Sequence, residues 1–359
     1  MKKKISPYHI FILGFLALIL LGTLLLLLPF ATVDGYRLSF VDALFTSTSA
    51  VCITGLLSVP TITGVYTLFG KIVIICLVEI GGLGFITIAT FIVSLFKQKI
   101  DFNDRVLIKE SLNQNSLKGM VKLVRITMYI ALLVQFIGAI LSFLVFIKDY
   151  DFWEAVGMGF FHAISAFNNA GFDLLPFGNS YYVYRGDVLF NVVTMCLIII
   201  GGLGFIVIYD VITKKNWHKL SIHSKIVIKT SLLLIVFGTV FFKILEGKNI
   251  TFLQALFNSV AARTAGFATI DMNTLSSASL IIMMILMYIG ASPASTGGGI
   301  KTTTFYIVAK HIISFARGKE PLTYKRKIAD NSIIKAYILI IVSAFVIVVT
   351  NAETIINIY

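Results

Sequence analysis

Charged residues are scarce in this sequence of 359 residues. Asp, Glu, Lys and Arg together make up 13% of it, whereas hydrophobic types make up 58% and the mean hydropathy is +0.94. A soluble domain carries roughly 25% charged residues. The scarcity of charge therefore excludes a soluble globular protein, a disordered chain and a collagen-like fibre. It predicts a membrane protein with several spans.

Cysteine and histidine are also rare. The three cysteines, Cys52, Cys76 and Cys196, lie in or beside apolar runs and show neither metal-ligand spacing nor a disulfide framework. Of the five histidines, His162 lies in an apolar segment and is expected to pack there rather than to bind a metal. No hydrolase triad, P-loop or Rossmann fingerprint occurs, so we expect no enzyme and no bound cofactor.

Acidic residues number 17 against 30 basic ones, which gives a net charge of +13. In a soluble protein this excess would suggest a nucleic-acid partner, but in a membrane protein its position matters more, and we expect no nucleic acid. Basic residues stay on the cytoplasmic side and attract anionic lipid. They cluster at 2–4, 97–125, 214–225 and 317–327, and these clusters alternate with poorly basic loops. This alternation predicts a multi-pass protein of the cell membrane with a cytoplasmic N-terminus and, after seven crossings, an extracellular Tyr359.

Long gaps between charges predict seven spans, since a helix needs about 20 mostly apolar residues to cross the hydrocarbon core. The first gap is too long for a signal peptide and no small-x-small cleavage site follows it, so we interpret it as a retained span. The predicted spans are 7–30, Tyr66–Phe96, between Arg125 and Lys148, between Asp187 and Asp210, Ile226–Phe242, between Asp271 and Lys301, and between Lys335 and Glu353.

Three further apolar segments, Phe40–Ala50, Phe152–Phe167 and Phe252–Ala262, are too short to cross. Each lies in an outer loop and is followed at once by a glycine-bearing stretch. Such a half-helix with extended backbone is tolerated at membrane depth only where it lines a water-filled cavity or is buried in protein. These segments are therefore predicted to be re-entrant.

The sequence repeats itself. Gly-Gly-Leu-Gly-Phe occurs at 81–85 and at 201–205, where we attribute it to close helix packing by small residues. The three re-entrant segments share an aromatic start, a Ser/Thr/Ala-rich body and a terminal glycine. The unit is span, re-entrant segment, glycine stretch and span. It predicts repeats at 1–100, 101–215 and 216–318, followed at 319–359 by the first span of an incomplete fourth repeat.

The glycines that end these segments, Gly55, Gly171 and Gly266, indicate an ion path. A helix whose C-terminal end points at the membrane midplane brings partial negative charge there. The backbone after it can turn carbonyl groups inward, as in the filters that replace the hydration shell of K⁺. Several loops must converge to surround an ion, and repetition within one chain supplies them.

Particular strings carry a resemblance to a known family. The segments Thr48–Leu56, Ser165–Asp173 and Ala262–Phe267 resemble the first three pore loops of the Trk/Ktr/HKT superfamily, and Gly290–Thr304 is similar to the gating loop of its KtrB-type subunit. The resemblance covers essentially the whole chain. It implies an all-α membrane protein with M1–pore loop–M2 units around a pseudo-four-fold pore, which conducts K⁺ passively. It further implies a homodimer on a cytosolic nucleotide-binding ring of the KtrA type, and sodium-dependent uptake.

The resemblance also implies roles for residues. In the family, carbonyls just before the filter glycine bind K⁺, and a loop below the filter acts as a gate. The implied filter residues are Ile53, Thr54, Gly55, Asn169, Ala170, Gly171, Thr264, Ala265 and Gly266. The implied gate residues are Gly290, Pro293, Ser295, Thr296, Gly297, Gly298, Gly299 and Lys301. Independently of the resemblance, the proline and the consecutive glycines cannot continue a regular helix, so the sixth span is expected to be broken there.

Three polar positions near the filter need an explanation. Glu79 lies inside the second span, where carboxylates are costly; a functional role and a structural hydrogen bond both remain open. Arg263 is expected to point away from the ion path and brace the filter backbone. Asn168 and Asn169 are expected to brace the second loop in the same manner.

The family's fourth pore loop and last helix have no counterpart in the sequence. We therefore expect a truncated member of the family. The alternative to a K⁺-conducting subunit is a non-conducting membrane fragment that keeps only the dimer and ring contacts.

Overall fold

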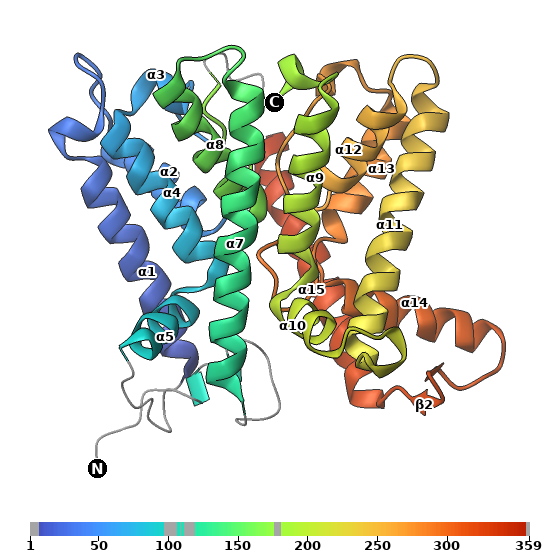
Figure 1. Cartoon of the computed structure of the whole chain (residues 1–359). Helices are drawn as coiled ribbons and strands as arrows, with labels where there is room; N and C mark the ends of the chain where they lie inside the picture. Colours follow the sequence, from blue (N-terminus) through green and yellow to red (C-terminus); the bar gives the residue numbers. More distant parts are fainter. Residues whose placement is uncertain (1–6, 97–105, 108, 111–118, 176–180, 357–359) are drawn as a thin grey trace.

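A computed structural model describes residues 7–96, 106–107, 109–110, 119–175 and 181–356. Within these residues the chain is helical apart from one short pair of antiparallel strands, β1 (Leu322–Thr323) and β2 (Arg326–Lys327). Most of the long helices run side by side, and the shorter helices lie between them or at one end (Figure 1). The membrane protein expected from composition and the all-α fold implied by the resemblance are both confirmed.

The helices follow one another in the order of the sequence repeats. The first group is α1 (Pro7–Leu26), η1 (Pro29–Ala31), α2 (Phe40–Val51), α3 (Ile62–Val65), α4 (Leu68–Leu83) and α5 (Phe85–Leu95). The second is α7 (Met120–Phe146), α8 (Phe152–Phe167), η2 (Tyr182–Tyr184), α9 (Val188–Leu203) and α10 (Phe205–Lys214). The third is η3 (Trp217–Lys219), α11 (Ile222–Glu246), α12 (Phe252–Ala261), η4 (Met272–Thr274), α13 (Ser277–Tyr288) and α14 (Thr302–Ala316), after which α15 (Asp330–Ile356) follows the strands.

Four helices of the described chain, α1, α7, α11 and α15, are long and apolar enough to cross a membrane. They correspond to the first, third, fifth and seventh predicted spans. The last three exceed the predicted bounds, because a helix of 25 to 27 residues is about 40 Å long and extends beyond the hydrocarbon core. Many of their outward side chains are apolar and exposed, as lipid-facing positions are.

The second and fourth predicted spans are not continuous helices, which corrects the sequence prediction. α4 and α5 meet at an angle of 93°, and α9 and α10 at 96°. The breaks fall at Gly84 and Gly204, whose φ angles are +81° and +92°. Residues with a side chain disfavour positive φ, whereas glycine adopts it readily. The third glycine of each Gly-Gly-Leu-Gly-Phe motif therefore ends one helix and begins the next.

The first glycine of each motif does pack closely, as expected. A Cβ built on Gly81 would lie 2.1 Å from the carbonyl oxygen of Val51, and one on Gly201 would lie 1.8 Å from that of Phe167. These carbonyls belong to the last residues of α2 and α8. Each motif therefore combines a contact with the end of a short helix and a sharp bend of the spanning helix.

The short helices α2, α8 and α12 lie where the re-entrant segments were predicted. α2 and α12 are packed against α1 and α11 by the same contact: Ser47 donates to the Ile19 carbonyl and Ser259 to the Ile235 carbonyl, each at 2.7 Å. Gly22 faces Ser47 in the first pair, and Gly238 faces Ser259 in the second. The absence of a glycine side chain lets the helices approach closely enough for the hydroxyl to reach the neighbouring backbone.

Candidate functional site

A tight turn with the same backbone follows each short helix. In each turn two residues, separated by one, have φ in the left-handed region. The first members are Ile53, Asn169 and Thr264 (φ +57°, +55° and +65°), and the second are Gly55, Gly171 and Gly266 (φ +76°, +75° and +80°). Left-handed backbone is uncommon outside glycine, and its recurrence at a β-branched isoleucine and threonine shows that the surroundings impose it.

Each turn is bonded to the helix that precedes it. The amides of Thr54 and Ala170 donate to the carbonyls of Ser49 and Ser165 at 2.8 and 2.9 Å, and that of Ala265 donates to the carbonyl of Ala261 at 3.0 Å. These amides are consumed at the helix ends. The amide of the middle residue of each turn is therefore already bonded to protein, whereas the carbonyls of the same residues are available to a ligand.

The three turns converge. A Cβ on Gly55 would lie 2.3 Å from the carbonyl oxygen of Ala170, and one on Gly171 would lie 3.0 Å from the Cα of Gly266. The second turn thus lies within van der Waals contact of both the first and the third turn, through glycine backbones. The structure therefore brings the residues predicted as filter together at one place.

Glu79 holds the second turn from the neighbouring helix. Its carboxylate accepts hydrogen bonds from Asn168 Nδ2 at 2.5 Å and from Gln135 Nε2 at 2.9 Å. A Cβ on Gly82 would lie 2.1 Å from Asn168 Oδ1, so this glycine leaves room for the amide. Of the two roles that the sequence left open for Glu79, the structure shows the structural hydrogen bond, which joins α4, α7 and the end of α8.

Arg263 is placed differently from the prediction. Its guanidinium donates to Ser231 Oγ at 3.3 Å and to the carbonyl of Gly290 at 3.2 Å. It therefore braces the beginning of the glycine-rich loop rather than the filter backbone. The reason is position: the residue directly follows Ala262, the C-cap of α12, and from there its side chain reaches α11 and the residues after α13.

Asn169 also departs from the expectation. Its side chain is 2% exposed, and neither amide atom has a hydrogen-bond partner among the described residues. It borders a cavity of about 20 Å³ that Arg263, Ser231 and Ala291 also line. A cavity of this size holds about one water molecule. Asn168, in contrast, braces the loop as predicted.

The loop that breaks the sixth predicted span lies between α13 and α14 and docks on the bend of the second repeat. The amides of Ser292 and Thr296 donate to the carbonyls of Gly202 and Gly201, at 3.0 and 3.3 Å. In return, the amide of Phe205 donates to the carbonyl of Ala294 at 2.8 Å. In a continuous helix these backbone groups would hydrogen-bond within the helix. The bend at Gly204 leaves them free, and the loop forms hydrogen bonds with them.

The same loop reaches the turns. Thr296 Oγ1 donates to the Phe167 carbonyl at the end of α8, and the Gly298 amide donates to Thr264 Oγ1, both at 3.0 Å. Lys301 turns back, and its Nζ donates to the Gly297 carbonyl at 2.7 Å. The residues predicted as a gate therefore lie directly against the residues predicted as a filter.

His162 is packed, as expected, and its ring nitrogens lie 2.9 Å from Tyr181 Oη and 3.0 Å from Thr194 Oγ1. In the described parts of the chain, no group of three or more His, Cys, Asp or Glu side chains could hold a metal ion. Asp173 follows the second turn, and burial raises the pKa of its carboxyl to about 6.

Apolar helices long enough to cross a membrane, with short helices, converging left-handed turns and a glycine-rich loop packed between them, define a multi-pass membrane protein. Residues 6–357 match the TrkH family of cation transport proteins, and the chain belongs to this family.

Relatives of known name support the assignment. The chain is 38% identical to the potassium/sodium uptake protein NtpJ of Enterococcus hirae, over 95% of this chain and 77% of that protein. It is 37% identical to the Ktr system potassium uptake protein B of Bacillus subtilis, over 96% of this chain and 79% of that protein. The potassium transporter TrkH from Vibrio parahaemolyticus shares the fold, with a TM-score of 0.67 at 20% identity over 93% of this chain and 69% of that chain.

Proposed function

We propose that this protein is a K⁺ uptake subunit that conducts the ion passively between the turns at Gly55, Gly171 and Gly266. The observation that carries the proposal is the contact of Gly171 with both Gly55 and Gly266, which brings equivalent backbones from all three repeats to one place. The names of the relatives, which are potassium and potassium/sodium uptake proteins, support the choice of ion.

The proposed filter works through main-chain oxygens. In each turn two left-handed residues flank one of ordinary φ, and we propose that this backbone turns successive carbonyls toward the ion. Rings of such carbonyls replace the hydration shell of K⁺. The C-terminal ends of α2, α8 and α12 add partial negative charge at the same place. The proposed ligands are the carbonyls of Ile53, Thr54, Asn169, Ala170, Thr264 and Ala265.

The loop at 290–304 is the proposed gate. Its contacts with Phe167 and Thr264 support this role, because a loop bonded to both the pore helix and the turn cannot move without releasing them. The small side chains of Ser292, Ser295 and Thr296 suit a loop that water reaches when it moves. No step of the proposed transport requires phosphoryl transfer or a cofactor.

The proposal extends to partners and location. Two relatives in Bacillus subtilis are named as parts of Ktr systems, which supports a partner subunit for this chain. We propose a homodimer in the cell membrane, with a cytoplasmic N-terminus, that assembles with a cytosolic nucleotide-binding ring of the KtrA type. Sodium dependence of uptake belongs to the same proposal, and the named potassium/sodium uptake relative supports it.

The test is Rb⁺ uptake in cells that lack their own K⁺ uptake systems. Gly171→Ser would place a side chain 3.0 Å from the Cα of Gly266, on a backbone with φ of +75°. We expect the variant to lose its preference for K⁺ over Na⁺ by at least tenfold while the protein still reaches the membrane. Gly186→Ser, where a Cβ meets nothing within 4 Å, is the matched control and should keep the preference.

An unchanged preference in Gly171→Ser would overturn the filter assignment. Absence of Rb⁺ uptake by the unsubstituted protein, expressed with its ring, would favour the alternative, a membrane protein that only interacts with its partners.

A further inference from the structure

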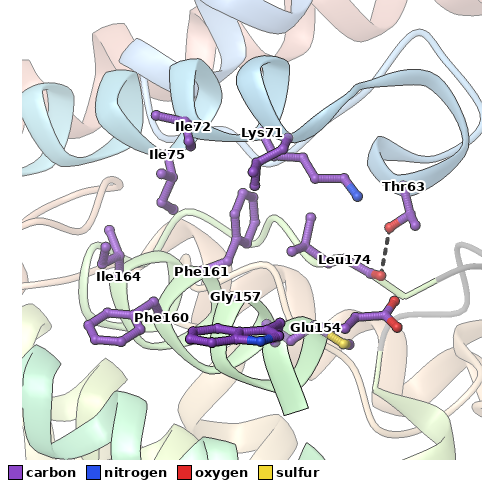
Figure 2. Close-up of a pocket in the computed structure, with 13 residues that line it drawn as sticks. Thr63, Lys71, Ile72, Ile75, Glu154, Gly157, Phe160, Phe161, Ile164 and Leu174 are labelled. Carbon is purple, nitrogen blue, oxygen red and sulfur yellow. Dashed lines mark hydrogen bonds between the residues drawn. The ribbon is translucent and has the colours of Figure 1, made fainter. Parts of the chain in front are cut away.

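A pocket of about 350 Å³ lies between α4 and α8. Its floor is apolar and includes Ile72, Ile75, Phe160 and Ile164. Its other end carries Lys71 and Glu154, together with a hydrogen bond of 2.6 Å from Thr63 Oγ1 to the Leu174 carbonyl. Figure 2 shows the ammonium of Lys71 and the carboxylate of Glu154 extending to the same end of the pocket, with Ile75 and Ile164 toward the other. The pocket is therefore amphipathic along its length.

The surroundings of the pocket place it against lipid. Leu68 and Trp153, which line it near the starts of α4 and α8, are 72% and 81% exposed, and Ile72 and Phe160 are also exposed. Exposed apolar side chains on spanning helices face the hydrocarbon, and tryptophan concentrates at the membrane interface. The apolar floor thus lies at the depth of acyl chains, and the charged end at the depth of headgroups.

Lys71 has no partner of its own within the described chain. No carboxylate there lies within ion-pair distance of its ammonium, although Glu154 is close enough to act on it electrostatically. A half-buried ammonium next to a headgroup layer attracts a phosphate, and the nearby carboxylate attracts a cation. The two charges are complementary to a headgroup that carries both.

We propose that this pocket binds one phospholipid with a zwitterionic ethanolamine headgroup. The phosphate lies at Lys71, the ammonium donates to Glu154, and one acyl chain lies along the apolar floor. An anionic glycerol headgroup is disfavoured, because it offers Glu154 no cation. A choline headgroup is disfavoured, because its nitrogen carries no hydrogen to donate. This site is independent of the proposed ion path.

Gly157 gives a direct test. It lines the pocket, and a Cβ built on it meets nothing within 4 Å, so the side chain of Gly157→Leu starts in open space and takes up part of the pocket, and leucine also favours the helix. The protein is placed in nanodiscs with equal amounts of ethanolamine, glycerol and choline phospholipids, and native mass spectrometry counts the lipids retained after the nanodisc is released. We expect one retained ethanolamine phospholipid per chain, and at least a tenfold loss in Gly157→Leu.

Charge variants test the headgroup and do not depend on the folding of Gly157→Leu. Lys71→Gln should lower retention of both ethanolamine and glycerol lipids. Glu154→Gln should lower only the ethanolamine lipid, by at least threefold relative to the glycerol lipid. The matched controls are Gly157→Ala, which leaves most of the pocket open, and Lys148→Gln, whose ammonium pairs with Asp187 elsewhere.

Three results would overturn the proposal. The first is equal lipid retention by Gly157→Leu and the unsubstituted protein. The second is a preference for the glycerol lipid by the unsubstituted protein. The third is that Gly157→Leu retains its lipid but changes from a dimer to a monomer. This result would show that the pocket is an interface between two copies of the chain.

Discussion

A few side chains fix the position of each turn, and Glu79 is the clearest of them. Its carboxylate is the acceptor for amide donors on two other helices, and one of those donors precedes Asn169 directly. A hydrogen bond to a charged group contributes about 1.5–3 kcal/mol. The sequence alone left open whether Glu79 has a functional or a structural role, and its hydrogen bonds with Gln135 and Asn168 explain its presence inside the membrane.

We expect Glu79→Gln and Asn168→Ala to be coupled. Each should destabilise the protein, and the double variant should be less destabilised than the sum by about 1–2 kcal/mol, since the charge-assisted bond can be lost only once. The free energy of unfolding in detergent micelles is measured for the two single variants and the double variant. The same cycle on Lys148 and Asp187, an exposed pair at 3.2 Å, should give no more than about 0.5 kcal/mol. Additive effects at Glu79 and Asn168 would show that the bond does not stabilise the turn.

Asp173 is expected to make uptake depend on external pH. Burial raises the pKa of its carboxyl from 3.8 to about 6, so the group gains its negative charge as the pH rises through about 6. Above that pH the carboxylate attracts cations to the second turn. Uptake of Rb⁺ should therefore fall about two- to fourfold as external pH is lowered from 7 to 5, which corresponds to a loss of roughly 0.5–0.8 kcal/mol of Coulomb attraction.

The stability of the fold changes in the opposite direction. Between pH 4 and 6 the folded state keeps a proton that the unfolded chain releases, so the free energy of unfolding decreases as the pH rises through this range. Asp173→Asn, which cannot ionise, should flatten both profiles. A pH profile of uptake unchanged by this substitution would assign the dependence to another group.

At the scale of elements, the main feature that sequence reasoning missed is the pair of right-angle bends. Hydrophobicity predicts a span from Tyr66 to Phe96, because α4 and α5 are both apolar and only the φ of Gly84 separates them. The signal was present as the third glycine of the repeated motif, but glycine within an apolar run is equally compatible with close helix packing, which Gly81 shows. The bounds of α2, α8 and α12 were predicted to within one residue, since charge gaps and glycines mark both of their ends.

The bends allow a matched comparison at the loop. Gly84 and Gly204 have similar φ angles, so alanine strains both by about 1 kcal/mol. A Cβ at Gly204 would also lie 2.5 Å from the carbonyl oxygen of Pro293, whereas at Gly84 the nearest atom is 3.7 Å away. Gly204→Ala should displace the loop and raise basal Rb⁺ flux in proteoliposomes several-fold, and Gly84→Ala should not. Equal flux through the two variants would remove the gate assignment.

That the predicted filter residues lie close together could be inferred from the sequence, but the positions of their supports could not. The glycines at 55, 171 and 266 recur in register, and repetition requires that they meet. Arg263 occupies the position in the third repeat that Asn168 occupies in the second, so the sequence suggested the same role for both. The structure gives Arg263 a different acceptor, the carbonyl of Gly290, because only the third repeat interrupts its last helix with a long loop.

At the scale of the whole molecule, the distribution of charge predicts the orientation in the membrane. Among the described residues, the basic segment around Lys214 and the β1–β2 hairpin lie at one end of the molecule, where α5 and α10 also lie (Figure 1). The basic positions 2–4 and most of 97–118 lie outside the described residues. The hairpin is held at that end by Tyr324, whose ring lies under the ammonium groups of Lys225 and Lys229.

Orientation can be measured with a membrane-impermeant thiol reagent. Cys52, Cys76 and Cys196 are first replaced by serine, which breaks no disulfide because all three are free. We expect Lys248→Cys, in the loop between α11 and α12, to react in intact cells, and Lys325→Cys, in the hairpin, to react only after the cells are opened. The reverse pattern of labelling would show that the protein has the opposite orientation in the membrane, and it would contradict the proposed assembly with a cytosolic ring.

The loop of the third repeat is attached to the second repeat by peptide groups: the amides of Ser292, Thr296 and Phe205 meet the carbonyls of Gly202, Gly201 and Ala294. Peptide groups are common to nearly all amino acids, so substitutions at Ser292 and Ala294 leave this attachment in place, unlike substitutions at the tightly packed Gly290, Gly297 and Gly299. An inserted or deleted residue, in contrast, shifts every donor away from its acceptor. Natural variation in this segment should therefore conserve length more strictly than side-chain identity.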